Sequence, residues 1–185
     1  MDTVLGILLG VGLAAACGFR IFVPFMVLSV AAQSGHLPLA EGFQWIGTPV
    51  ALVAFALATV LEVAAYFIPW VDNLLDALTT PVTIVAGMVA TAAVVTDLPP
   101  MLQWTVAMIA GGGVAGIVQG GSAATRLVSS ATTGGFGNFA VSAAELVGAV
   151  VTSIAAVFAP LLGGLLAIAL VLFVLSRWRK RRTAA

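Results

Sequence analysis

The chain has 185 residues, of which 62% are hydrophobic and only 8% are charged, and its formal net charge is zero. This composition excludes a soluble globular domain and is typical of an integral membrane protein. Because one helical crossing takes about 20 apolar residues, the chain has room for about five to seven spans and for no separate soluble domain. The single cysteine excludes an intramolecular disulfide and any multi-cysteine metal site.

The first hydrophobic segment runs from about Val4 to Ser34 and is too long to cross a bilayer as a straight helix. Its roughly 30 residues would extend about 45 Å, whereas the hydrocarbon core is about 30 Å thick. Pro24 is the predicted interruption, because proline removes a hydrogen bond to the carbonyl of Arg20. The segment has no basic leader and exceeds the length of a signal-peptide core, so we expect a retained helix. The loop over 35–47 is predicted to be interfacial.

Two more hydrophobic segments follow, separated by a short amphipathic stretch. The second segment covers about 48–69, and Trp45 and Trp70 stand at its rims as in an aromatic belt. Residues 70–80 are predicted to form a separate amphipathic piece, with leucines on one side and Asp and Asn on the other. The third segment, over 81–95, begins at a proline.

The fourth segment, over about 101–130, is long again, and its second half is rich in Gly, Ala, Ser and Thr. Such a stretch is a poor lipid-facing helix, so we expect it to be surrounded by other helices or to line a cavity. The glycines at 111–113 and 120–121 are its predicted breaks. A glycine-rich turn leads to the fifth segment, over about 139–159, and the sixth segment ends at Ser176.

Basic residues are concentrated at the C-terminal end. Five of the seven Lys and Arg residues lie in the last nine positions, directly after the apolar run 161–175. Because basic residues beside a hydrophobic segment stay in the cytoplasm, the tail 177–185 is predicted to be cytoplasmic. A nucleic-acid-binding tail is the disfavoured alternative, because the tail joins the hydrophobic run directly and contains Trp178 at interface depth.

These segments predict an all-α integral membrane protein, a bundle of about six transmembrane helices within one transmembrane domain, 1–185. An even number of spans would place the N- and C-termini together in the cytoplasm, with the bundle in the bacterial inner (cytoplasmic) membrane. The halves 1–97 and 98–176 have the same order of an interrupted helix with an arginine, a helix with a glutamate and a shorter helix. This order is compatible with two inverted three-helix halves. A gapless alignment on the arginines does not superpose the glutamates, so a bundle without a repeat remains the alternative.

Four charged residues fall inside the hydrophobic segments: Arg20, Glu62, Arg126 and Glu145. A charge at the centre of a bilayer costs about 2.5 to 3.5 kcal/mol on insertion scales, so each one needs a partner, water or a route to the interface. Counting residues from the connecting loops places the arginine and the glutamate of each half at the same depth. With six spans, all four charges lie at one level, which predicts a cluster that is neutral in sum.

This cluster is the predicted solute-binding site, and hydroxyls near Arg126 extend it. Hydroxyl groups, together with backbone exposed at glycine breaks, can ligate an ion or a polar solute. The predicted substrate-binding residues are Arg20, Glu62, Arg126, Glu145, Ser122, Thr125 and Ser129. The alternative interpretation is structural, with two independent ion pairs that hold helix pairs together. Small residues would then serve only to let helices approach closely.

Two strings in the first half, GFRIFVPF at 18–25 and WVDNLLD at 70–76, together with the glycine-rich turn before Glu145, resemble a family of membrane proteins. This family comprises small bacterial integral membrane proteins catalogued as a domain of unknown function of the 4126 type. The resemblance covers nearly the whole chain and brings no activity with it. It implies that Arg20 and the aspartates of the second string matter to the fold or to the site. Those aspartates, Asp72 and Asp76, could bind a cation, but acidic residues at a helix start are favoured by the helix dipole anyway.

Two functions follow from these features. The first is a small transporter or channel for a small polar or anionic solute that uses the buried Arg/Glu pairs. The alternative is a non-transporting membrane scaffold or assembly protein whose buried charges are structural. An enzyme is disfavoured, because the one histidine lies outside the apolar segments and no metal-ligand spacing or nucleophile with a base is found. The expected partners are membrane lipids, a small polar solute or ion and further copies of the chain, with no nucleic acid, cofactor or metal.

Overall fold

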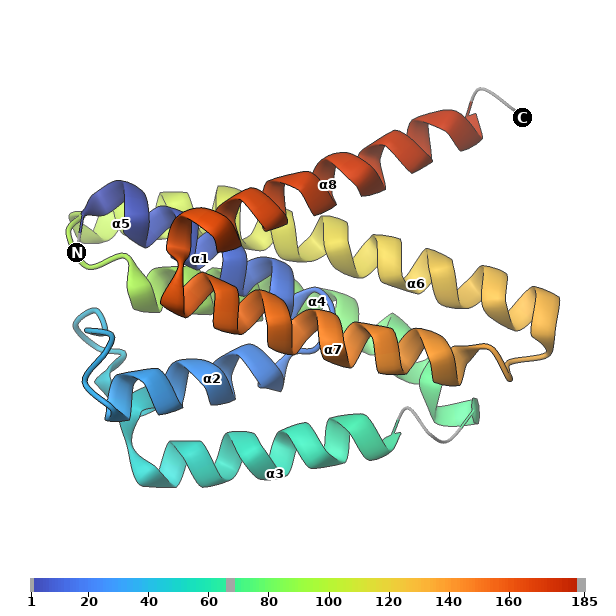
Figure 1. Ribbon diagram of the computed structural model, residues 1–185, viewed down its shortest axis with the longest axis horizontal. Coiled ribbons are helices and arrows are strands. Elements are labelled where there is room, and N and C mark those ends of the chain that lie inside the picture. Colours follow the sequence, from blue (N-terminus) through green and yellow to red (C-terminus); the bar gives the residue numbers. More distant parts are fainter. Residues whose placement is uncertain (1, 66–68, 183–185) are drawn as a thin grey trace.

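The structure is a computed structural model that describes the backbone of residues 2–65 and 69–182 and the side chains of 2–65 and 79–179. Within these ranges the chain is helical, and most helices lie along one long axis (Figure 1). Three of the described helices are long and apolar enough to cross a membrane: Pro100–Thr133, Asn138–Phe158 and Pro160–Arg179. These features are those of an all-α membrane bundle, as the composition predicted.

The first hydrophobic segment forms a hairpin. Helix α1 (Thr3–Cys17) runs from the N-terminal end to the middle of the bundle, and α2 (Phe22–Gln33) returns to the same end (Figure 1). The interruption predicted at Pro24 is present, but it lies just upstream, at residues 18–21. Pro24 occupies the first turn of α2, where its missing N–H leaves no helical hydrogen bond unmade.

This hairpin changes the predicted topology. Because the chain turns back in the middle of the bundle, α1 and α2 do not form one crossing. The start of α1 and the end of α8 (Pro160–Arg182) consequently lie at opposite ends of the long axis (Figure 1). The sequence predicted one bent crossing here, and the structure differs because residue spacing alone cannot distinguish a bent helix from a reversed one. The side of the membrane that each terminus faces stays a prediction.

The next two helices run in opposite directions along the long axis (Figure 1). After a 3-10 turn, η1 (Gln44–Gly47), α3 (Pro49–Ala65) lies at the edge and packs against α2 (Figure 1). Helix α4 (Pro69–Val94) then returns, with Pro81 inside it. The amphipathic piece and the third segment are therefore one continuous helix, because a proline removes one hydrogen bond while the ladder continues on both sides of it.

The second half starts with one uninterrupted helical stretch. The two predicted glycine breaks are wrong: one pair of glycines lies inside α6, and residues 107–112 form a π-helical turn that continues the helix. The helices of this half are α5 (Pro100–Val106), the π-helix η2 (Ala107–Gly112), α6 (Gly113–Thr133), α7 (Asn138–Phe158) and α8. The interrupted first helix expected in both halves is thus seen only in the first.

Close helix contacts explain these glycines. A Cβ atom at Gly111 would lie 2.6 Å from the carbonyl oxygen of Gly87 on α4. At Gly121 it would lie 2.9 Å from a methyl group of Val174 on α8. Small residues let helix backbones approach in a membrane bundle, and here they serve that purpose rather than breaking the helix.

The centre of the bundle is α1. All of its residues from Leu9 to Cys17 are buried, and it packs against α4, α7 and α8. The buried turn at the end of α1 therefore projects into the space among α3, α6 and α7, where the polar site lies. Helix α8 diverges from the other helices toward its C-terminal end (Figure 1).

Candidate functional site

The turn between α1 and α2 leaves the first N–H groups of α2 without helical partners, and Glu62 on α3 supplies the acceptors. Its Oε1 accepts a hydrogen bond from the N–H of Ile21 at 2.8 Å, and its Oε2 accepts one from Phe22 at 3.2 Å. Non-helical backbone at membrane depth is tolerated only where such groups are satisfied within the protein. The half-buried carboxylate of Glu62, on the neighbouring helix α3, thus caps the N-terminus of α2.

Arg20 extends from this turn to α7. Its side chain is 1% exposed, and its Nη2 donates a hydrogen bond to the carbonyl of Ser142 at 3.1 Å. The same nitrogen lies 3.5 Å from Oε2 of Glu145. Arg20 therefore connects the turn of the hairpin to the carboxylate on α7.

Glu145 is the centre of the site. Arg126 on α6 donates from Nε to Oε1 at 3.1 Å and from Nη2 to Oε2, and Ser122 donates to Oε1 from its hydroxyl. Ser122 and Arg126 are four residues apart and so share one face of α6. All three side chains are buried. One carboxylate thus accepts hydrogen bonds from α6 and faces a guanidinium from the α1–α2 turn.

The structure brings the four predicted charges together, with one change of partner. The predicted pair of Arg126 and Glu145 is present, whereas Arg20 contacts Glu145 instead of Glu62. Glu62 still has favourable Coulomb interactions with both arginines. The partner changes because the reversal at residues 18–21 turns the arginine toward α7 and leaves the backbone N–H groups facing Glu62.

The other predicted hydroxyls lie outside this cluster. Thr125 is exposed and donates to the carbonyl of Gly121 at 2.9 Å, within its own helix. Ser129 packs against Gly137 at the turn before α7, one helical turn beyond Arg126. The two aspartates of the second sequence string lie at positions whose side chains are outside the described residues.

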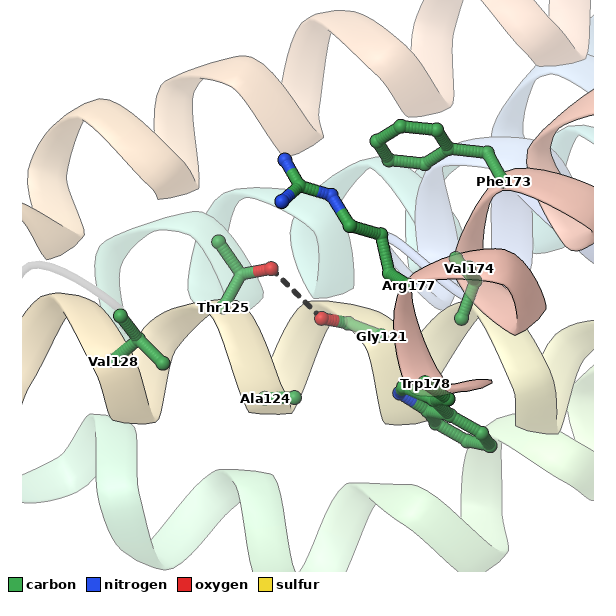
Figure 2. Close-up of a pocket in the computed structure, with 8 residues that line it drawn as sticks. All are labelled: Gly121, Ala124, Thr125, Val128, Phe173, Val174, Arg177 and Trp178. Atoms are coloured by element: carbon green, nitrogen blue, oxygen red, sulfur yellow. Dashed lines mark hydrogen bonds between the residues drawn. The ribbon is translucent and has the colours of Figure 1, made fainter. Parts of the chain in front are cut away.

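A cavity of about 270 Å³ between α6, α7 and α8 reaches the site. Ser122 and Glu145 form part of its wall, and the rest of the lining is Phe19, Val118, Gly121, Thr125, Val141, Ala144, Leu170, Phe173 and Val174. A second cavity, of about 450 Å³, shares four of these residues and extends toward the C-terminal end of α8. Figure 2 shows this second cavity between α6 and α8, with Arg177 reaching across it from α8.

Sequence reasoning missed three contributors to this region: Ser142, Phe19 and Arg177. Ser142 stands three residues before Glu145, so helical spacing could have placed it on the same face. Its carbonyl receives Arg20, and its hydroxyl is buried with no hydrogen-bond partner in the described part of the chain. Arg177 served the sequence analysis only as a topology signal, because nothing local indicates a cavity beside it.

Comparison with known proteins agrees with the resemblance of the two sequence strings. No curated protein and no solved structure matches the chain. The family described as Domain of unknown function (DUF4126) matches residues 7–180, which is nearly the whole chain. The chain that places two buried arginines on one carboxylate is therefore a member of the DUF4126 family.

Proposed function

We propose that the protein is a small membrane transport protein that binds a small polar or anionic solute at the Arg20–Arg126–Glu145 site. One observation carries this proposal: the carboxylate that both arginines contact also forms part of a cavity wall. A charge cluster that only locks helices together needs no such opening. A solute in the cavity can accept hydrogen bonds from Ser122 and compete with Glu145 for Arg126.

The donor chemistry favours an anion. A guanidinium presents planar, paired N–H groups that match a carboxylate or phosphate, and its hydrogen bonds to charged acceptors are the strong ones. In a bundle with little water these interactions are strengthened further. An incoming anion would take over donors that Glu145 now occupies, so binding is an exchange and leaves no guanidinium without an acceptor.

The arrangement of the helices suggests how the solute would reach the site. With the long axis across the bilayer and the basic end of α8 in the cytoplasm, the larger cavity opens on the cytoplasmic side. The α1–α2 hairpin then enters from the other side as a re-entrant pair, and its turn meets the cavity system at Phe19. In this arrangement the protein lies in the bacterial inner membrane with its N-terminus outside.

A non-transporting scaffold is the second candidate. One observation favours it: Glu145 already accepts hydrogen bonds from Ser122 and Arg126 with no solute present. Replacing a buried ion pair often leaves stability unchanged, so such a cluster alone is weak evidence for a structural role. Catalytic chemistry forms no part of either proposal.

The test is binding and uptake by the purified protein. Thermal shifts are measured against a panel of small inorganic and organic anions and neutral polar solutes, because a ligand stabilises the state that it binds. The solutes that give a shift are then tested for uptake into proteoliposomes. We expect Ser122→Ala to weaken binding and uptake while the protein still folds, because only one donor is lost.

Arg179→Gln is the matched control for Arg126→Gln, since it also removes an arginine charge, but its side chain is exposed near the C-terminal end of α8, whereas Arg126 is buried in the charge cluster. We expect Arg126→Gln to abolish uptake and Arg179→Gln to leave it near the wild-type rate. If no solute of the panel shifts the wild-type protein, or if uptake is equal in Ser122→Ala and wild type, the transport proposal is wrong.

A further inference from the structure

We propose that the cavity of about 450 Å³ between α6 and α8 (Figure 2) is a binding site for the phosphate of an anionic phospholipid. The cavity lies at the basic end of α8. Its binding group is separate from the buried charge cluster, although the cavity shares four lining residues with the one that reaches the cluster. The lipid proposal holds whether or not the protein transports a solute. Its volume is in the range of pockets that hold small ligands.

The packing of α6 against α8 forms the cavity. Three of the four α6 residues in the wall are small, Gly121, Ala124 and Thr125, and they leave space where larger side chains would fill it. Trp178 packs closely on Gly120, so that a Cβ there would lie 3.1 Å from the indole ring. Together with the contact of Val174 on Gly121, this holds the two helices at a set separation.

Arg177 supplies the phosphate-binding group. Its guanidinium carbon lies 5.5 Å from the centre of the Phe173 ring, which orients the side chain over the cavity (Figure 2). The side chain is exposed, and in the described part of the chain no carboxylate pairs with it. Among the described residues that line the cavity, none is acidic, and Arg177 is the one cation. Within this described lining, a phosphate would meet a cation and no carboxylate.

The surroundings favour a lipid as the source of the phosphate. Val128 and Phe173, at the edge of the cavity, are 44% and 57% exposed, so acyl chains leaving the phosphate would lie over apolar side chains. With the basic end of α8 at the membrane surface, Trp178 would lie at the depth of the headgroups that aromatic belts occupy. Basic pockets between transmembrane helices on the cytoplasmic side bind anionic headgroups, which agrees with the charge of this end of α8.

The experiment uses the full chain in zwitterionic detergent, titrated with phosphatidylglycerol or with phosphatidylcholine, and measures the thermal shift and the bound lipid by native mass spectrometry. We expect phosphatidylglycerol to stabilise the protein and phosphatidylcholine to have little effect. Arg177→Gln should weaken phosphatidylglycerol binding about tenfold or more, because a charge-assisted hydrogen bond is lost.

The matched control is Arg179→Gln, which removes the same charge two residues away but does not line the cavity. It should weaken binding by about fivefold at most, as expected for diffuse attraction to a surface. A second variant, Ala124→Leu, fills the cavity without changing any charge and should weaken binding as Arg177→Gln does.

Three outcomes would overturn the proposal. Equal losses in Arg177→Gln and Arg179→Gln would show a diffuse attraction to the basic tail. Full binding by Ala124→Leu would place the lipid elsewhere. Equal stabilisation by inorganic phosphate or glycerol phosphate would identify a free anion, and not a lipid, as the ligand.

Discussion

Replacing Glu145 by glutamine is the most direct perturbation of the site. Glutamine keeps the size of the side chain and one carbonyl oxygen, but it removes the negative charge and turns the second oxygen into an N–H donor. That donor would face Nη2 of Arg126, which now donates to Oε2 of Glu145. Arg20, 3.5 Å from the same oxygen, would also lose this carboxylate as a neighbour.

The loss of stability expected for Glu145→Gln follows from the burial of these groups. Glu145 is 5% exposed, and Arg126 and Arg20 are 2% and 1% exposed, so water cannot take the place of the carboxylate. Removing one partner of a buried ion pair costs about 3 to 5 kcal/mol, because a buried charge is left uncompensated. At about 1.4 kcal/mol per factor of ten, the ratio of folded to unfolded protein should fall by a factor of about 100 or more.

The assay is unfolding of the purified protein in mixed micelles with increasing SDS, followed by circular dichroism. Glu41→Gln is the control, because Glu41 is an exposed loop residue and loses the same charge. It should unfold with the wild-type free energy. If the unfolding free energy of Glu145→Gln is within about 1 kcal/mol of that of Glu41→Gln, the carboxylate does not neutralise the buried arginines.

Three further predictions concern the framework of the site, and the same unfolding assay checks them. Glu62→Gln should lower the free energy of unfolding by about 0.5 to 2 kcal/mol, as expected for the loss of a helix cap. The reason is that the side chain loses one of the two oxygens that accept hydrogen bonds from the backbone at the start of α2. An unchanged free energy of unfolding would contradict the capping role. Gly111→Ala should destabilise by about 1 to 3 kcal/mol because its Cβ would press on α4, whereas Gly113→Ala, with open space around it, should be neutral or stabilising. Equal effects of these two changes would refute the close contact. Gln103→Leu should cost about 1 to 3 kcal/mol, because Nε2 donates to the carbonyls of Ala92 and Val95 at 2.8 and 3.0 Å and the end of α4 would lose both bonds.

Counting residues from the connecting loops predicted part of the charge cluster. Counting from the loops correctly placed Arg126 opposite Glu145, because both lie on continuous helices joined by a short turn. The same count placed Arg20 in the cluster but paired it with Glu62 and not with Glu145, because Arg20 lies in a non-helical turn where residue number no longer measures depth. The hydroxyls of Thr125 and Ser129 were predicted from proximity in sequence, but the Thr125 hydroxyl bonds to its own helix, and Ser129 lies one turn beyond Arg126, against Gly137.

Hydrophobicity, the scarcity of charge and the basic C-terminal run are properties of the residues themselves, so the sequence alone determined the membrane class, the helical fold and the existence of buried charges that need partners. Tertiary packing decided what these patterns leave open. It decided that the first segment reverses in the middle of the bundle, that glycine pairs bring helices together without breaking them, and that both arginines meet at Glu145. The physical reason is that each of these outcomes depends on which groups from distant parts of the chain satisfy the backbone and the charges where water is absent.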